Sequence, residues 1–387
     1  MRAQDRMLAE QDVAILKTQG DLQVALNTSV AVARAGTSAD ARLFDWKTTT
    51  DSSESELSMV ASQLVWDGGK VQYQLDAARA VFLQSNDTYD HYSIEIRYGL
   101  RTQFLSVWAA QMLLKLNQKI LKRRETQCKQ VEYRYKAGLE NLGALAIAKA
   151  NLGDAQFQVS DAQRAIKKKR ILLEKMLGCP VPTMAVTLNS TVETIDVDQI
   201  PTLALQHPAS SQVAHQIKTA ESQLAYQQSL YMPDVYFNIQ ADKTLANPFH
   251  NNPSNTDQWG ATVVGTWQLW DSGQRHASIE KATIQLAQLR LRYDDTLAQL
   301  KANLHAAFLD YESSCDDLEN QKSILLAIEE RAKIMATQYD SGLITFNDWS
   351  LIEDKRVSAE KAVLQAHQNY YVAIDAWIMA RGGQLNE

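Results

Sequence analysis

Two long stretches of the chain place apolar residues at alternating intervals of three and four positions. In the second stretch these residues are Tyr293, Leu297, Leu300, Leu304, Ala307, Tyr311, Leu318, Leu325, Ile328, Ala332, Met335 and Tyr339. In the first they are Ile96, Leu100, Val107, Ala110, Leu114, Leu121, Cys128, Val131 and Tyr135. This spacing is a heptad seam, typical of helices that pack along their length. Residues 71–135 hold one glycine and residues 275–339 hold none. We therefore expect two continuous helices of about 65 residues, each nearly 100 Å long at ~1.5 Å per residue.

The apolar period changes from helical to two ahead of each long helix. Leu22, Val24, Leu26, Val30 and Val32 alternate with small or polar residues, and so do Pro233, Val235, Phe237, Ile239 and Ala241. Each set predicts a strand, paired with a second strand at residues 57–65 or 259–269, with polar loops at residues 37–54 and 245–258. Four strands of about ten residues each fit tilted membrane strands. The residues expected to face lipid are Leu22, Val24, Leu26, Val30, Val235, Phe237 and Ile239, and those expected to face water are Gln23, Asn27, Asn238 and Gln240.

The chain also repeats itself. Two W-D-x-G segments begin at Trp66 and Trp270, which are 204 positions apart. The same offset, without a gap, also aligns two Y-x-x-G-L segments. We therefore predict an internal repeat. We expect a first repeat at residues 1–178, a linker at 179–200 forming an equatorial region, and a second repeat at 201–387.

The Y-x-x-G-L segments predict turns at the ends of the long helices, at residues 135–139 and 339–343. Gly138 and Gly342 suit a left-handed helix end that precedes a returning helix. The fold class is therefore mainly α with a small β part, built from long antiparallel coiled-coil helical hairpins and four strands. Four strands cannot close a barrel, and an open edge in lipid would leave backbone groups unpaired, so neighbouring copies are needed.

Composition excludes several kinds of function. A net charge of -6 gives no general field for nucleic acid. Three cysteines without C-x-x-C spacing indicate neither a zinc site nor a disulfide set, and Cys128 is expected to be buried in the seam. No apolar run approaches the roughly 20 residues of a spanning helix. No phosphate-binding or metal-binding motif is present, so we expect no catalytic residue, no cofactor and no metal.

Two other interpretations remain open on the residues alone. A coiled-coil scaffold explains the heptads but has no need of the period-2 segments. An enzyme would depend on an acidic pair such as Asp316 and Asp317, which point about 100° apart on a helix. Trp66 and Trp270 could pack at the junctions or belong to an interfacial aromatic belt.

The sequence resembles the TolC-like outer-membrane efflux proteins over about residues 10 to 382. The resemblance is carried by "LVWDGGK", "QLWDSGQ", "YMPDVYF", "HPASSQVAHQIKTAESQLA", "YKAGL" and "YDSGL". It implies a homotrimer whose 12-stranded barrel lies in the outer-membrane lipid of a Gram-negative-type bacterium and joins an α-helical periplasmic tunnel. It also implies the exit duct of a tripartite efflux pump or type I secretion system, with a periplasmic adaptor (membrane fusion) protein and an inner-membrane transporter as partners. The first repeat begins at Met1, as though a signal peptide and the start of a helix were missing.

The resemblance also assigns roles to particular residues. Asp348 and Tyr339 are expected to form the periplasmic aperture, Asp348 as a ring of three carboxylates and Tyr339 as a latch. The alternative for Asp348 is a capping role at the start of the returning helix. The adaptor-contacting hairpin tips are expected to be Tyr135, Gly138, Leu139, Tyr339, Gly342 and Leu343. The strand-helix junctions are Trp66, Asp67, Gly69, Trp270, Asp271 and Gly273.

Overall fold

The computed structural model describes residues 2–41, 44–180, 197–246 and 254–383 of the chain. Its two longest helices are α2 (Lys70–Lys136) and α6 (Gln274–Asp340), each of 67 residues. Adding the offset of 204 to the ends of α2 gives the ends of α6 (70 + 204 = 274 and 136 + 204 = 340). The prediction of two long uninterrupted helices is confirmed.

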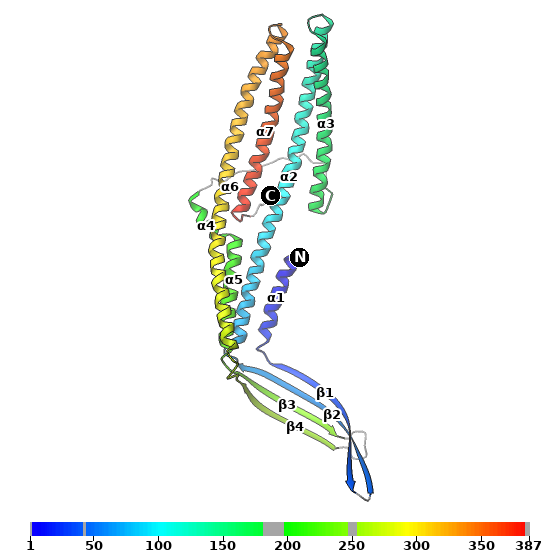
Figure 1. Ribbon diagram of the computed structural model, residues 1–387, viewed down its shortest axis with the longest axis vertical. Helices are drawn as coiled ribbons and strands as arrows, with labels where there is room; N and C mark the ends of the chain where they lie inside the picture. The colour runs from blue at the N-terminus through cyan, green and yellow to red at the C-terminus, as the bar shows by residue number, and fades with distance from the viewer. Residues whose placement is uncertain (1, 42–43, 181–196, 247–253, 384–387) are drawn as a thin grey trace. The chain divides into compact units, whose positions relative to one another are not determined.

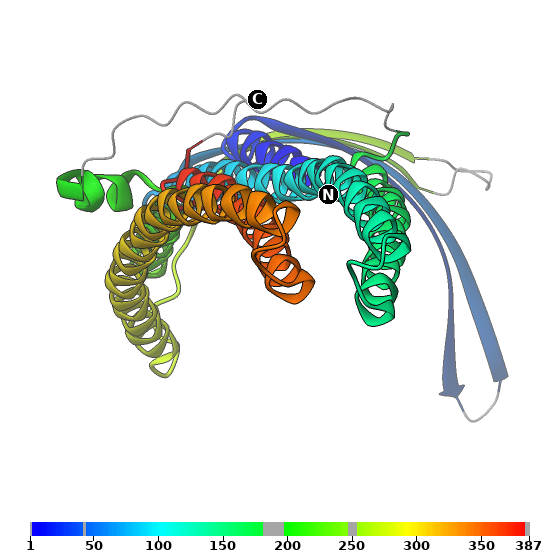
Figure 2. The same ribbon diagram turned by 90° about the horizontal axis from the view of Figure 1, so that it is seen from above.

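Each long helix is followed by a shorter helix that returns along it. These are α3 (Leu142–Leu177) and α7 (Phe346–Ala380), and the same offset relates their first residues. Figures 1 and 2 both show α3 beside the later part of α2 and α7 beside the later part of α6. The two predicted helical hairpins are therefore present.

The strands form one antiparallel sheet in the order β1-β2-β3-β4. They are β1 (Gln23–Ala41), β2 (Phe44–Trp66), β3 (Asp234–Ala246) and β4 (Ser254–Thr266). Four strands were expected, but their length of about ten residues was wrong. Residues 37–41 and 44–54, expected to be a polar loop, pair as strand because ladder hydrogen bonds need no apolar side chain. Residues 254–258 of the second expected loop also belong to a strand, and residues 247–253 lie outside the described residues.

Four shorter helical segments complete the described chain. α1 (Arg2–Thr18) precedes β1, while η1 (Val197–Gln199), α4 (Ile200–Gln206) and α5 (Pro208–Ser229) lead into β3. Most of the predicted linker, residues 181–196, lies outside the described residues. Within the described chain, no helix has a stretch apolar and long enough to cross a membrane.

The contacts divide the chain into two compact units, and each unit takes residues from both repeats. One comprises Met1–Tyr89 with Ser211–Asp294, and contains the sheet. The other comprises Asp90–Ser210 with Asp295–Glu387, and contains both helical hairpin ends. The division into residues 1–178, 179–200 and 201–387 describes repetition rather than compact units, and it stays a prediction.

The unit with the hairpin ends has two apolar cores. One joins all four hairpin helices and includes Val131, Tyr339 and Trp349, while the other joins α4 to α6 and α7 through Ile200, Leu304 and Trp377. Cys128 is buried in the first core, as is Ala332, the residue 204 positions later. The predicted burial of Cys128 in the helix seam is thus confirmed.

Candidate functional site

The strand register divides the sheet into an apolar face and a polar face. Residues directly opposite each other across an antiparallel ladder share a face. One row across the sheet joins Val24, Ala61, Ile239 and Ala261, and another joins Leu26, Met59, Ala241 and Trp259. The rows on either side of these two hold polar residues, namely Gln23, Ser62, Asn238 and Thr262 in one and Asn27, Ser58, Asp242 and Gln258 in the other, and the row between the two apolar rows joins Ala25, Val60, Gln240 and Gly260. The two apolar strand patterns predicted from the sequence therefore lie on one face of the sheet.

A side-chain hydrogen bond and an ion pair mark the two faces. On the polar face, Ser62 Oγ donates to Asn238 Oδ1 at 2.7 Å across β2 and β3. On the apolar face, the row after Trp259 carries an ion pair between Lys243 Nζ and Asp257 Oδ1, 3.7 Å apart and mostly exposed. This ion pair ends the continuous apolar stretch of β3 and β4.

Asp67 begins α2 at the first strand-helix junction. Its carboxylate accepts hydrogen bonds from the backbone N–H groups of Gly69 at 2.8 Å and Val71 at 2.6 Å. These N–H groups have no partner within the helix, so the side chain caps the helix. Gly68 and Gly69 have φ of 68° and 89°, a conformation that side chains disfavour. The W-D-x-G motif therefore starts a helix directly after a strand.

Asp271 does the same at the second junction. Its carboxylate accepts from the backbone N–H groups of Gly273 at 3.1 Å and Arg275 at 3.0 Å. It also pairs with Arg275 Nε at 2.6 Å. Burial alone would raise the pKa of Asp271, but the Arg275 side chain and the backbone donors outweigh it and lower the pKa. Trp66 is 46% and Trp270 is 82% exposed, so packing within the chain does not explain these tryptophans.

Both junctions are tied to the segment between α5 and β3, a role that the sequence did not indicate. Lys70 Nζ contacts Met232 O at 3.1 Å and Asp234 Oδ1 at 2.6 Å. Arg275 Nη1 donates to Leu230 O at 3.1 Å. Residues 230–234 thus connect the starts of α2 and α6.

The hairpin ends of the two repeats have the same backbone. Leu139 N donates to Arg134 O and Leu343 N to Gln338 O, each at 2.8 Å. Gly138 and Gly342 each have φ of 72°. This is a Schellman helix end, which requires a left-handed residue after the cap. The left-handed glycines predicted at both turns are confirmed.

The surroundings of the two ends differ. Tyr339 is fully buried and stacks on Trp349, with ring centroids 4.5 Å apart, and Arg134 of α2 lies over its other side. Tyr135, its counterpart in the first repeat, is 38% exposed. Leu139 and Leu343, which follow the two glycines, are 66% and 74% exposed. Each turn therefore presents an apolar side chain to solvent, whereas Tyr339 belongs to a core.

The latch role predicted for Tyr339 concerns its hydroxyl. Its hydroxyl is buried and has no hydrogen-bond partner among the described residues. Burial and the nearby Glu140 carboxylate raise the pKa of Tyr339 to about 12. A latch role for this hydroxyl stays a prediction.

Asp348 completes a capping box at the start of α7. Its backbone N–H donates to Thr345 Oγ1 at 3.3 Å, and its carboxylate accepts from Thr345 Oγ1 at 2.7 Å and Thr345 N at 3.3 Å. In the first repeat Asn141 caps Ala144, with 2.8 Å between Oδ1 and N. The capping interpretation of Asp348 is therefore observed, while its carboxylate remains exposed at the surface.

The sequence also did not predict an ion pair that connects the two hairpins. Arg123 of α2 binds Glu360 of α7 through two hydrogen bonds of 2.7 and 2.6 Å. Glu360 is buried, and its carboxylate also faces Lys119 at 3.6 Å. This ion pair joins a helix of the first repeat to one of the second.

Candidate metal ligands do not gather in the described part of the chain. No group of three or more His, Cys, Asp or Glu side chains there is placed to hold an ion. What the described residues present instead is a sheet with an apolar and a polar face, capped junctions, and two hairpin ends with exposed leucines.

A family model described as "Outer membrane efflux protein" matches residues 2–179 and 200–377, which together are most of the chain. The chain belongs to the outer membrane efflux protein family. No curated protein sequence matches it. Proteins of this family are outer-membrane efflux channels. The protein is accordingly an exit duct of an efflux system in the outer membrane.

Solved structures of outer-membrane channels share the fold of this efflux protein. CusC is 15% identical with a TM-score of 0.85, covering 99% of this chain and 88% of its own. VceC of Vibrio cholerae is 15% identical with a TM-score of 0.83, covering 100% and 93%. The open state of MtrE from Neisseria gonorrhoeae is 16% identical with a TM-score of 0.80, covering 100% and 86%. At these identities the likeness concerns the fold alone.

Proposed function

We propose that three copies of this efflux protein close a 12-stranded barrel, joined to an α-helical periplasmic tunnel that conducts substrates passively. The observation that carries the proposal is the two-faced sheet with two free edges, β1 and β4. Backbone groups at a sheet edge cannot stay unpaired in lipid, so β4 of one copy must meet β1 of the next. The apolar face then contacts outer-membrane lipid, and the polar face lines the water-filled interior.

The sheet faces are tested by cysteine accessibility. With Cys128, Cys179 and Cys315 replaced by serine, single cysteines are placed at Val24 and Ile239 and at their neighbours Gln23 and Asn238. A water-soluble maleimide should label Gln23→Cys and Asn238→Cys in membranes but not Val24→Cys or Ile239→Cys. Labelling of Val24→Cys and Ile239→Cys instead would place the wrong face in lipid.

The trimer is tested by its size. We expect the protein to need detergent for extraction and to give the mass of three chains by light scattering with detergent subtraction. A single chain, or extraction without detergent as for a coiled-coil scaffold, contradicts the barrel.

No nucleic acid is expected to bind, since the chain carries a net charge of -6.

We further propose that the hairpin ends contact a periplasmic adaptor, which links the channel to an inner-membrane transporter of an efflux pump or type I secretion system. The support is the pair of matched turns, Tyr135–Leu139 and Tyr339–Leu343, each with an exposed leucine. Leu139→Asp and Leu343→Asp should abolish efflux while trimers still assemble, because a charge cannot enter an apolar contact. Efflux unchanged in the double variant would exclude the turns as the contact.

A third proposal concerns the periplasmic aperture, which the exposed Asp348 and the buried Tyr339 would form together. Threefold symmetry would bring together three Asp348 carboxylates, which would favour cations and bind multivalent ones. Its support is the exposure of Asp348 beside the turn. Single-channel recordings of Asp348→Asn should lose cation selectivity and multivalent-cation block. Thr345→Ala is the matched control, because it removes a capping partner and leaves the carboxylate. Equal effects of the two variants would leave Asp348 with its capping role only.

A further inference from the structure

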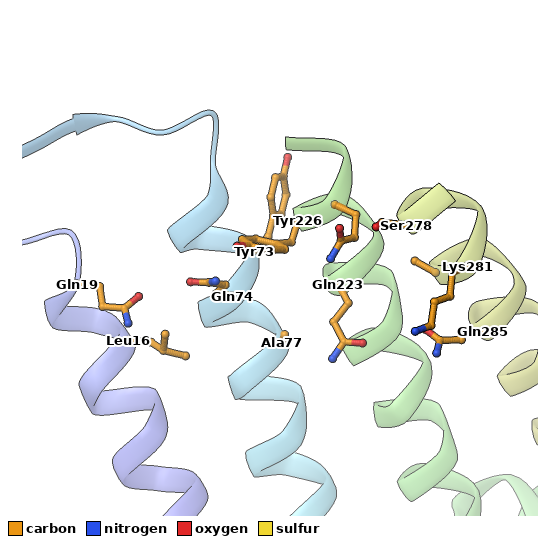
Figure 3. A pocket seen from close by; sticks show the side chains of 12 residues that line it. Leu16, Gln19, Tyr73, Gln74, Ala77, Gln223, Tyr226, Ser278, Lys281 and Gln285 are labelled. Atoms are coloured by element: carbon orange, nitrogen blue, oxygen red, sulfur yellow. The ribbon is translucent and has the colours of Figure 1, made fainter. Parts of the chain in front are cut away.

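A hollow of about 630 Å³ lies where α1, α2, α5 and α6 run together in the unit that contains the sheet. Figure 3 shows side chains of all four helices around it, with Leu16 on α1, Gln74 on α2, Gln223 on α5 and Gln285 on α6, and Gln19 in the turn that follows α1. Its volume falls in the range of small-molecule sites. All its lining residues belong to one compact unit.

The lining is rich in amides and phenols. Five glutamines line the hollow, together with Tyr73 and Tyr226, and Lys281 is the single charged residue in the lining. Each amide offers donors and an acceptor, and each tyrosine offers an apolar ring face with one hydroxyl. The hollow thus presents many directional hydrogen-bonding groups and two rings, but little charge.

These hydrogen-bonding groups are free of protein partners. Among the described residues, none of the five glutamine side chains that line the hollow, nor either tyrosine hydroxyl, makes a hydrogen bond to the protein. Gln72 of α2 and Gln299 of α6, which lie outside the hollow, are paired with Asp76 and Asn303, each at 2.9 Å. Five amides without such a partner line one hollow, where a ligand could pair with them.

The composition of the lining selects the class of ligand. A cationic ligand would meet no carboxylate and would be repelled by Lys281. A multiply charged anion would find one ammonium group where several are needed to offset its desolvation. An apolar ligand would bury amides without partners, which is unfavourable. What remains is a molecule with many hydroxyl or amide groups and an apolar face that can lie on a tyrosine ring.

We propose that this hollow is a binding site for carbohydrate, either a neutral oligosaccharide or one with a single negative charge. Sugar hydroxyls would pair with the glutamine amides, the C–H face of a sugar ring would lie on Tyr226 or Tyr73, and Lys281 would hold an acidic substituent. The sugar could come from a soluble oligosaccharide or from the glycan of an envelope lipid, because both present the same groups.

The test titrates the full chain with sugars. The protein is kept in an amine-oxide detergent, because glycoside detergents would occupy the site. Binding of chitotetraose and maltotetraose is followed by saturation-transfer NMR and calorimetry, and binding of lipopolysaccharide is measured directly by surface plasmon resonance on the immobilised protein. We expect a Kd of about 0.1 to 1 mM, typical of a small open site. Binding of lipopolysaccharide with no binding of free sugars would identify the lipid glycan as the source.

Paired variants separate the site from general effects. Gln74→Ala and Tyr226→Ala should each weaken binding about ten-fold, as expected for the loss of one aromatic or hydrogen-bonding contact. Gln72→Ala, two positions from Gln74 but outside the hollow, should bind as the wild type does. Tyr226→Phe keeps the ring and should retain part of the affinity if Tyr226→Ala folds poorly. Absence of binding by both oligosaccharides and by lipopolysaccharide, or affinities unaltered in Gln74→Ala and Tyr226→Phe, overturns the proposal, and the efflux assignment would stand in either case.

Discussion

The guanidinium of Arg134 lies 4.7 Å from the centroid of the Tyr339 ring, and its Nη1 donates a hydrogen bond to Tyr339 O at 3.0 Å. One side chain of the first repeat thus holds both the ring and the carbonyl at the end of α6.

Arg134→Ala should loosen this helix end. Loss of the cation–π contact and of hydrogen bonds to helix-terminal carbonyls costs about 1–2 kcal/mol of local stability. We expect faster amide hydrogen exchange in residues 338–343, measured by mass spectrometry. The control is Arg331→Ala, because Arg331 is an exposed arginine on α6, the helix whose end is measured. Equal exchange in both variants would mean that Arg134 does not hold the turn.

We expect substitutions of the two junction aspartates to lower the free energy of unfolding by different amounts. Asp67→Ala removes a helix cap and should cost about 1 kcal/mol of unfolding free energy. Asp271→Ala should cost more, because it also leaves Arg275, whose side chain is largely buried, without its 2.6 Å ion pair. Guanidinium unfolding in detergent measures both. Asp67→Asn should lie between the wild type and Asp67→Ala, because the amide keeps only one of the two oxygens that accept from Gly69 and Val71. A larger loss for Asp67→Ala than for Asp271→Ala would contradict this account.

The pair formed by Arg123 and Glu360 predicts a pH dependence. Burial raises the pKa of Glu360, but the hydrogen bonds and charge of Arg123 outweigh it, so the pKa lies below the ordinary value of 4.5. A lowered folded pKa stabilises the fold above about pH 4.5, and the stabilisation is lost as the pH falls through the folded pKa. Glu360→Gln should cost about 2–4 kcal/mol at pH 7 and flatten the stability profile below pH 5.

Unfolding of the wild type and Glu360→Gln at several pH values between 3 and 7 measures this difference. Glu330→Gln serves as the control, because Glu330 is 70% exposed in its pair with Lys333 and should contribute little. Parallel pH profiles for the wild type and Glu360→Gln would refute the role of the pair.

Substitutions of Tyr339 distinguish a packing role of its ring from a latch role of its hydroxyl. Its hydroxyl is buried without a partner, so Tyr339→Phe should be within about 1 kcal/mol of the wild type or more stable. Tyr339→Ala should cost about 3–5 kcal/mol through the cavity it leaves. Because the folded pKa is raised to about 12, the contribution of Tyr339 should fall as the pH rises above the ordinary value of 10.0. Increased channel conductance in Tyr339→Phe would instead support the latch.

The helices and turns were predictable from the sequence because their signals are local. The period of apolar residues and the absence of glycine gave residues 71–135, within one residue of each end of α2. Gly138 and Gly342 indicated the turns, because their backbone conformation excludes most side chains. The alternation along β1 and β3 likewise predicted which residues share a face, because the side chains of a strand alternate.

The errors and omissions share a physical cause. Residues 37–54 were expected to be a loop, because a strand that is polar on both sides has no hydrophobic period to detect. The contacts of Arg134 with Tyr339 and of Arg123 with Glu360 span 205 and 237 positions and depend on how whole helices are rotated. The glutamines of the hollow lie on three different helices and in the turn after α1, and no spacing along the chain relates them.

Because an offset of 204 residues relates the two repeats, a position in one repeat can be compared with its counterpart in the other repeat of the same chain. Gly138 and Gly342 have the same φ and the same hydrogen bonds, yet a Cβ added at Gly138 would meet open space, whereas one added at Gly342 would lie 3.8 Å from Arg134 Nη2. Substituting both glycines in the same way applies equal backbone strain at each site. Any difference between the two losses of stability is therefore due to the surroundings alone, which comparisons between separate proteins rarely isolate.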